Sequence, residues 1–349
     1  MSITILNNFT IAAKVYFAAF GVVENMTKDS VLAILAKEKK YISGEEISRE
    51  IGVSRAAVNA AVKALRAEGH EIDSVTNKGY FLKASPDALS AGLVGAYLDP
   101  ERMKSVVVLE TVDSTNKRLR EMAFDGAPDG QVVMANEQTS GRGRRGRNFF
   151  SPKDKGIYFS YLIKPDMAPA DAVSLTAWTA VATTRAISEV SGFTPGIKWV
   201  NDLVSGGRKL CGILTEMSVE SETGRIDNII IGIGININND ASDFPDEIKD
   251  IATSIALEAG HSIDRSELAA AMVRELDRMR ADWPDNKDSY LEAYRQADIT
   301  CGRAVNVIQG GSVRPAEALN INDDFSLKVR FSDGQVSDLS SGEVSLKIL

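Results

Sequence analysis

Seven consecutive residues, 141–147, read Gly-Arg-Gly-Arg-Arg-Gly-Arg in a chain whose formal net charge is -8. Glycines let backbone N–H groups approach a ligand closely, and arginine binds phosphate or carboxylate through paired hydrogen bonds. The segment lies between two apolar runs, 132–135 and 157–162, that are typical of strands. The pattern therefore favours an anion-binding loop carried by a sheet over a disordered basic segment that binds RNA.

Further segments have side chains suited to a polar ligand. Residues 113–116 (Asp-Ser-Thr-Asn) follow a strand-like run and precede a helical pattern, where they either bind a neutral ligand or cap the helix. Residues 198–202 and 208–216 predict a tight hairpin that turns through 205–207, with Lys209 on the second arm. Residues 229–236 predict a buried strand whose glycines permit close approach of a ligand or another backbone. This strand lacks the full dinucleotide fingerprint, which argues against a Rossmann fold.

The composition disfavours several kinds of site. The two cysteines, Cys211 and Cys301, lie far apart and form no C-x-x-C motif, as is typical of a reducing compartment, and we expect a cytoplasmic protein. The two histidines, His70 and His261, are not near a cysteine, so neither a zinc site nor a Ser-His-Asp triad is expected. We expect both histidines at the surface and no metal bound by protein side chains.

The N-terminal 25 residues do not resemble a targeting segment. Lys14 interrupts the apolar stretch 11–23 and no basic segment precedes it, so neither a secretory signal nor a membrane-spanning helix is expected. A helical pattern opens at residue 26, with Thr27 as a candidate N-cap. We expect the functional chain to begin there, and residues 1–25 to be an extension without function.

Residues 26–84 have the pattern of a winged helix-turn-helix. Apolar residues at 31–35 predict one helix, Ser43 opens a second that turns at Gly52, and Ser54 caps a third that ends near Gly69. Residues 71–75 and 79–83 then predict a hairpin wing, joined through Asn77-Lys78-Gly79.

DNA binding is the favoured role of this unit, although a bundle used only for protein contacts has the same pattern. The side chains expected to reach phosphates and base edges are Ser54, Arg55, Asn59, Lys63 and Lys78. Because the positive charge is modest, we expect weak binding by one copy and dependence on dimerisation.

Together and in this order, these segments resemble the biotin protein ligases, and with the winged helix in front they are similar to the bifunctional members that also repress the biotin operon. The resemblance runs from about residue 31 to the C-terminus and includes Ser-Arg-Ala-Ala-Val-Asn at 54–59 and Lys-Gly-Tyr at 78–80. It implies an α/β (α+β) fold with a winged helix at 26–84, a catalytic domain at 85–298 with a mixed sheet like that of class II synthetases, and an SH3-like barrel at 299–349. The barrel strands are expected at 304–308, 316–320, 327–331 and 344–348.

The resemblance also implies roles for individual residues. Those implied to bind biotin are Ser114, Thr115, Asn116, Gln138, Arg142, Gly143, Arg144 and Lys209. Those implied to lie on the nucleotide side are Arg145, Arg147, Phe149, Asn201 and Asn236, with Phe149 where family members often have tryptophan. The residues expected to act in catalysis are Lys209 and Arg144, as the resemblance implies, and Asp202, a candidate that we add from the chemistry. Asp202 either orients or deprotonates the acceptor lysine or is only an ion-pair partner of Lys198 or Arg208.

The implied activity uses ATP, Mg²⁺ and biotin to form biotinyl-5'-AMP, and then transfers biotin to a lysine of a biotin carboxyl carrier protein. Such chemistry depends on positioning and charge stabilisation and needs no protein nucleophile. The family implies that the adenylate-bound homodimer binds operator DNA of genes for biotin synthesis or transport, and that no membrane is involved. Two alternatives stay open, a lipoate-type protein ligase and a ligand-sensing transcription factor without turnover.

Overall fold

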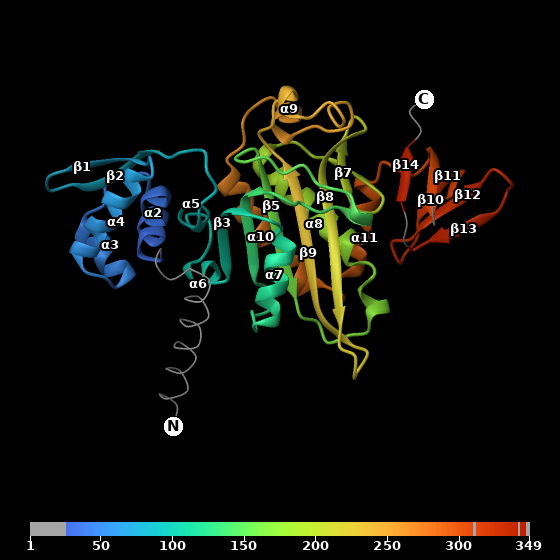
Figure 1. Cartoon of the computed structure of the whole chain (residues 1–349), viewed down its shortest axis with the longest axis horizontal. Helices are drawn as coiled ribbons and strands as arrows, with labels where there is room; N and C mark the ends of the chain where they lie inside the picture. The colour runs from blue at the N-terminus through green and yellow to red at the C-terminus, as the bar shows by residue number, and fades with distance from the viewer. Residues whose placement is uncertain (1–25, 310–311, 341–342, 347–349) are drawn as a thin grey trace. The chain divides into compact units, whose positions relative to one another are not determined.

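The computed structural model describes residues 26–309, 312–340 and 343–346, which form two compact units that divide between Val108 and Leu109 (Figure 1). The expected extension 1–25 lies outside the described residues. The boundary that we expected at residue 84 stays a prediction, and the first unit continues beyond it.

The described residues of the first unit form five helices and a two-stranded hairpin. Its elements are α2 (Met26–Glu38), α3 (Gly44–Ile51), α4 (Arg55–Ala67), β1 (Glu71–Val75), β2 (Gly79–Ala84), α5 (Ala91–Gly95) and α6 (Pro100–Met103). Leu32, Leu35, Ile47, Val58 and Leu65 are fully or almost fully buried at its centre. The winged helix-turn-helix expected from the sequence is confirmed.

Local hydrogen bonds explain where these helices begin and end. Ser43 accepts from the backbone N–H of Glu46 and Ser54 accepts from that of Ala57, so these two predicted N-caps are confirmed. The third candidate, Thr27, lies inside α2 instead. Gly52 ends α3 with a φ of +69°. One expectation was wrong: His70 is only 8% exposed, because its ring packs against Ser85 with Nδ1 3.0 Å from the hydroxyl oxygen. Burial lowers the pKa of His70.

The second unit contains a seven-stranded sheet with strand order β3-β4-β5-β9-β8-β7-β6. The strands are β3 (Val106–Val112), β4 (Val132–Gln138), β5 (Gly156–Ile163), β6 (Gly196–Lys198), β7 (Asp202–Ser205), β8 (Arg208–Val219) and β9 (Ile226–Asn236). The hairpin between β7 and β8 turns at Gly206 and Gly207, with φ of +55° and +82°, as a two-residue turn of this kind requires. The predicted tight hairpin is confirmed.

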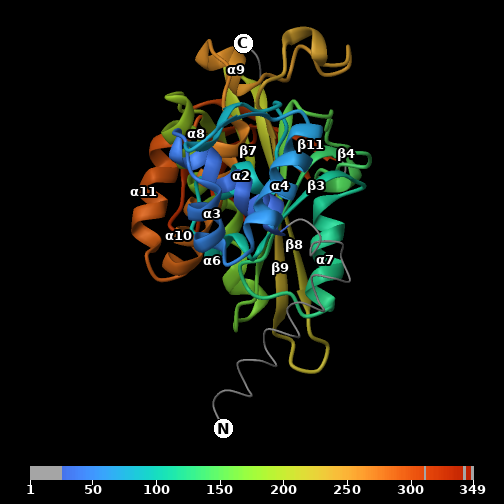
Figure 2. The same cartoon turned by 90° about the vertical axis from the view of Figure 1, so that its left-hand side faces the viewer.

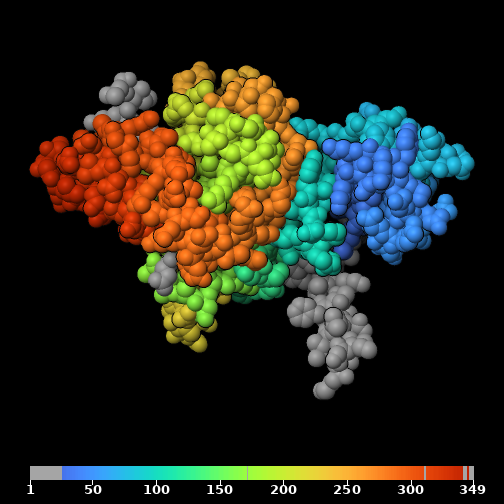
Figure 3. Space-filling view, turned by 180° about the vertical axis from the view of Figure 1, so that it is seen from behind, coloured from blue at the N-terminus to red at the C-terminus, as the bar shows by residue number. Residues whose placement is uncertain are grey.

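Helices cover both faces of this sheet. Helix α7 (Thr115–Phe124) packs on β4, β5 and β9, and on the opposite face lie α8 (Leu175–Ser191), α10 (Arg265–Asp282) and α11 (Lys287–Ala297) (Figures 2 and 3). Every residue of β5 is therefore buried. In the back layer, the rings of Trp178 and Tyr290 stack with centroids 4.0 Å apart.

The C-terminal part is a five-stranded antiparallel sheet with order β13-β12-β11-β10-β14, consistent with the expected SH3-like barrel. Its strands are β10 (Ala304–Gln309), β11 (Ser312–Ile321), β12 (Leu327–Phe331), β13 (Val336–Leu339) and β14 (Glu343–Leu346). The short strand β13 was missed because its four residues, Val-Ser-Asp-Leu, do not alternate between polar and apolar types. Trp199 ties this sheet to the large one: its indole Nε1 donates to the carbonyl oxygen of Phe325 over 3.0 Å.

Candidate active site

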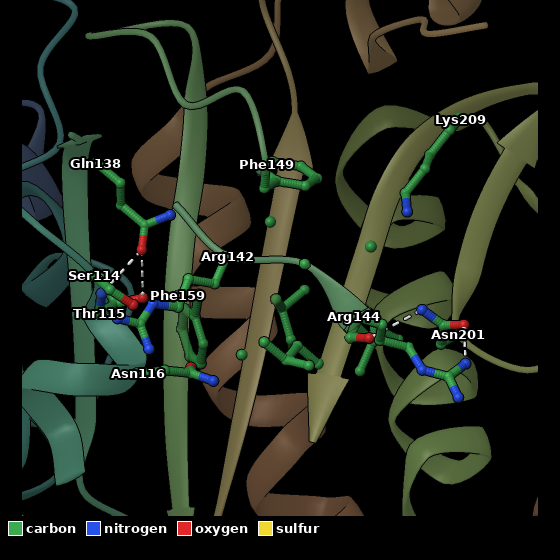
Figure 4. Close-up of a pocket in the computed structure, with 17 residues that line it drawn as sticks. Ser114, Thr115, Asn116, Gln138, Arg142, Arg144, Phe149, Phe159, Asn201 and Lys209 are labelled. Carbon is green, nitrogen blue, oxygen red and sulfur yellow. Dashed lines mark hydrogen bonds between the residues drawn. The ribbon is translucent and has the colours of Figure 1, made fainter. Parts of the chain in front are cut away.

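A pocket opens on the face of the large sheet that also carries α7, above β5, β9 and β8 (Figure 4). Its volume, including the open mouth, is about 480 Å³. Ten residues singled out from the sequence line it: Ser114, Thr115, Asn116, Gln138, Arg142, Gly143, Arg144, Phe149, Asn201 and Lys209. The lining residues that were not named individually as site residues are Phe159, Gly212, Ile213, Leu214, Gly232, Ile233 and Gly234, although all except Phe159 lie in the segments 208–214 and 229–236.

The polar residues of the lining fall into two groups. In Figure 4, Ser114, Thr115 and Gln138 lie at one end, whereas Arg144 and Lys209 lie at the other. Ser114, Thr115 and Gln138 are uncharged and offer hydroxyl and amide groups, with the guanidinium of Arg142 beside them, whereas Arg144 and Lys209 are cationic. The pocket is thus matched to an elongated ligand with a neutral polar head and an anionic tail.

The neutral end is organised by the junction of β3 and α7. Ser114 occupies the N-cap position of α7, but its side chain makes no capping hydrogen bond and lines the pocket instead. Gln138, at the end of β4, accepts from both the backbone N–H and the hydroxyl of Thr115, over 2.9 and 3.1 Å. The Gln138 amide donates in turn to Ser151. Of the two readings of 113–116, ligand binding therefore fits better than capping.

Asn116 is held from two sides at the base of the pocket. Its amide donates to Glu216 over 2.8 Å, and its oxygen lies 2.6 Å from the Ser160 hydroxyl. Both atoms of the amide are thereby engaged by protein. Gly232 makes room for this arrangement, since a Cβ there would lie 2.4 Å from the Asn116 oxygen. The sequence predicted that a ligand or another backbone approaches the β9 glycines, whereas in the structure the side chains of Asn116 and Phe149 do so.

The arginine loop, residues 141–147, forms a turn that is closed by backbone hydrogen bonds. Gly143 donates to the carbonyl of Arg147 over 2.7 Å, and the backbone of Phe149 donates to that of Gly141 over 2.9 Å. Arg144 reaches across the pocket and donates to the Asn201 oxygen over 2.8 Å. Arg145, with a φ of +56°, points away and donates to the carbonyl of Ile308 in the C-terminal sheet.

Phe149 lies directly over β9. A Cβ at Gly234 would be 2.5 Å from its ring, so only glycine allows the ring to rest on the strand. The ring also meets Tyr158 edge-on, with centroids 6.5 Å apart. It presents an aromatic face to the pocket between the neutral and the cationic end (Figure 4).

A β-bulge turns Lys209 toward the site. Leu203 pairs with Cys211 but Val204 pairs with Lys209, so Leu210 is the extra residue. A shift of one residue reverses the side of the sheet on which a side chain lies, and Lys209 consequently extends over Gly212. Its ammonium donates to Asp202 over 2.6 Å and its side chain is 38% exposed. Burial raises the pKa of the neighbouring Cys211 thiol, which therefore supplies no thiolate at neutral pH.

Four of the singled-out residues do not line the pocket: Asp202, Arg145, Arg147 and Asn236. Asp202 accepts from Lys209, and Lys198 lies 4.0 Å away, whereas Arg208 pairs with Glu258 instead. The side-chain amide of Asn236 donates to the carbonyl of Thr253. Direct ligand contact by these four residues stays a prediction.

The side chains expected to contact DNA are all exposed on α4 or on the wing: Ser54, Arg55, Asn59, Lys63 and Lys78. Ser54 also caps α4, and Asn59 donates to the hydroxyl of Tyr80 over 3.2 Å. The cap uses only the oxygen of Ser54, so its hydroxyl proton is still available to a phosphate. The contacts of these five residues with DNA stay a prediction.

Two features of the described residues concern metal binding and membrane-spanning helices. In the part of the chain that the structure describes, no group of three or more His, Cys, Asp or Glu side chains is placed to hold a metal ion. Within the same residues, no helix is both long enough and apolar enough to span a bilayer.

Comparison with known proteins gives matches for both units. Residues 108–236 match the Biotin/lipoate A/B protein ligase family, and residues 27–81 match the HTH domain family. The chain is 40% identical over 242 residues to the bifunctional ligase/repressor BirA of Bacillus subtilis, covering 69% of this chain and 74% of that protein. It is 30% identical over 325 residues to BirA of Escherichia coli, covering 93% and 98%.

Solved structures are similar to the second unit. The biotin protein ligase from Aquifex aeolicus in complex with biotin and ATP matches with a TM-score of 0.59 and 26% identity, covering 69% of this chain and 98% of that one.

Proposed function

Because the chain belongs to the family of bifunctional biotin ligase/repressor proteins, we propose that it forms biotinyl-5'-AMP from biotin and ATP, biotinylates a lysine of a biotin carboxyl carrier protein, and represses transcription as an adenylate-bound dimer. The observation that carries the proposal is the two-ended pocket, with a neutral head end at Ser114, Thr115 and Gln138 and a cationic end at Arg144 and Lys209. Biotin has a neutral ureido ring at one end and a carboxylate at the other.

The first step is the attack of a biotin carboxylate oxygen on the α-phosphorus of ATP, with pyrophosphate leaving with its bonding electrons. The biotin carboxylate, the α-phosphate and the leaving pyrophosphate are all negatively charged and repel one another. We infer that Arg144 and Lys209, which line the pocket, lower this repulsion with their positive charges. Phe149 offers a face on which the adenine can stack.

Magnesium supports the same step by neutralising phosphate charge. Because the described residues provide no cluster of three acidic or His/Cys ligands, we infer that the ion is held mainly by the triphosphate.

In the second step, the lysine amine of the carrier protein attacks the acyl carbon, the bond to AMP breaks, and the amine loses a proton. Asp202 is our candidate for orienting that amine or accepting the proton. In the pocket without ligand, the Lys209 ammonium lies 2.6 Å from a carboxylate oxygen of Asp202. The ammonium must therefore move toward the phosphate of the adenylate before the Asp202 carboxylate can accept a proton.

The test of this function is biotin-dependent exchange of labelled pyrophosphate into ATP. The proposal requires exchange with biotin. Exchange with lipoate and not with biotin would identify a lipoate-type ligase, and binding of biotin with ATP but without exchange would identify a sensor without turnover.

Two glycines on β9 provide a paired prediction. Gly232→Ala places a methyl group against Asn116, so the affinity for biotin should fall; Gly234→Ala places one against Phe149, so the affinity for ATP should fall instead. Overpacking costs of about 1–3 kcal/mol correspond to roughly 10- to 100-fold in each dissociation constant. Titration of each variant with each ligand checks this. Equal losses for both ligands in both variants would contradict the assignment of the two ends.

The arginine loop should be protected from trypsin by ligands. Arg142, Arg145 and Arg147 are exposed in the free protein. We expect the adenylate to order their backbone, so cleavage after these residues should slow severalfold when biotin and ATP are added together. Cleavage at the exposed Arg225, in the turn between β8 and β9, serves as the internal control. A cutting rate within the loop that the ligands leave unchanged would refute the ordering.

A further inference from the structure

Lys209 is held through its own backbone between two segments. On one side it pairs with Val204 of β7. On the other side its backbone N–H donates to the carbonyl of Ile251 over 2.8 Å, and its carbonyl accepts from the N–H of Thr253 over 2.9 Å. The position of the ammonium therefore depends on both the β7–β8 hairpin and the segment 251–253.

One carboxylate joins these two segments. Glu258, on the short helix α9 (Ile255–Ala259), accepts from the Ser205 hydroxyl at the end of β7 over 2.6 Å. It also accepts from the Thr253 hydroxyl over 2.6 Å and from Arg208 over 2.8 Å. Glu258 thus contacts the last residue of β7, the first residue of β8 and the segment that pairs with Lys209.

The surroundings of Glu258 favour a fixed geometry. Its side chain is 14% exposed, and Thr253 is fully buried. Burial alone would raise the pKa of Glu258, but the hydrogen bonds from Ser205 and Thr253 and the charge of Arg208 lower it. The carboxylate is ionised at neutral pH and saturated with donors. Asn236 supports the same segment from β9 by donating to the carbonyl of Thr253.

We propose that Glu258 is a positioning residue for adenylate formation: it fixes the β7–β8 hairpin to residues 251–253 and so holds Lys209 where the carboxylate and α-phosphate meet. Glu258 does not line the pocket and takes no part in the chemistry. The proposal rests on the ligase function proposed above.

The matched variants are Glu258→Ala and Glu258→Gln. Alanine removes all three hydrogen bonds, so the Lys209 ammonium is no longer held in one position. A displacement of about 1 Å of a group at the reacting centre costs up to roughly 100-fold in rate. We expect adenylate formation to fall roughly 10- to 100-fold. Glutamine keeps an oxygen for Thr253 and offers its amide to the Ser205 hydroxyl, which can rotate to accept. Glu258→Gln should therefore retain the rate within about threefold.

A double-mutant cycle with Lys209→Ala separates positioning from a general structural role. If Glu258 acts through Lys209, Glu258→Ala should lower the rate of the Lys209→Ala protein by less than about twofold. If the loss is general, the two effects should multiply, and that result would overturn the proposal. Glu247→Ala, which removes an exposed acid from the same connection between β9 and α9, is the control and should change nothing.

Other outcomes also decide the matter. Full activity of Glu258→Ala would refute the positioning role. A loss in Glu258→Gln as large as in Glu258→Ala would refute the hydrogen-bond basis of the proposal. The failure of the proposed function itself is seen separately, because the unmodified protein would then show no biotin-dependent pyrophosphate exchange at all.

Discussion

Lys209→Ala is expected to lower the rate of adenylate formation by roughly 10²-fold or more, the usual effect of losing one preorganised charge at a reacting centre. The ammonium lies in the pocket beside Gly212 and is paired with Asp202 at 2.6 Å. Its removal has two consequences. The carboxylate and phosphate lose a cation, and Asp202 loses its nearest partner and repels the same anions.

The second consequence can be measured separately. Asp202→Asn in the Lys209→Ala protein should recover part of the lost rate, because it removes the unpaired negative charge and leaves the missing cation unreplaced. Pyrophosphate exchange and single-turnover formation of the adenylate are the measurements. Lys249→Ala removes an exposed lysine that is paired only at the surface, and this control should stay within about twofold. Near-normal turnover of Lys209→Ala would leave Lys209 with a structural role only.

Features that depend on residues close together in the sequence could be predicted from it, and features that depend on distant residues could not. The caps at Ser43 and Ser54 and the turn at Gly206–Gly207 depend on neighbouring residues, so their residue types alone predict them. The site lining was predicted because four separated motifs, at 113–116, 141–147, 198–203 and 208–214, were matched to a family. Composition alone indicated no more than an anion site at the arginine loop.

The remaining features depend on contacts between distant segments. The bulge at Leu210 leaves no mark in the sequence, although it decides on which face Lys209 lies. The network from Glu216 through Asn116 to Ser160 joins three elements and is specified only once the sheet has formed. His70 was placed wrongly because its burial depends on the connection at Ser85, outside the hairpin.

Repression should depend on exposed side chains of α4 and on the ligand together. Arg55→Ala/Asn59→Ala/Lys63→Ala in the full chain removes two cations and one amide from the exposed face of α4. We expect operator affinity to fall at least ~10²-fold, since each base-directed or phosphate contact contributes about 1–3 kcal/mol and a dimer loses every contact twice. Carrier biotinylation should be unchanged. Lys164→Ala/Lys249→Ala removes two exposed cations from the second unit and should leave DNA binding intact.

The expected dependence of DNA binding on biotin and ATP rests on the net charge of the chain. The chain carries a net charge of -8, and one winged helix with a few exposed cations has little attraction for DNA. We therefore expect two copies to bind together on a palindromic site. If the adenylate favours the dimer, biotin with ATP raises operator affinity by raising the dimer population, and salt weakens the complex steeply. Sedimentation and DNA titration on the same sample measure both quantities. A dimer population that does not change with biotin and ATP, or full operator binding without them, would mean that ligand in the pocket does not regulate DNA binding.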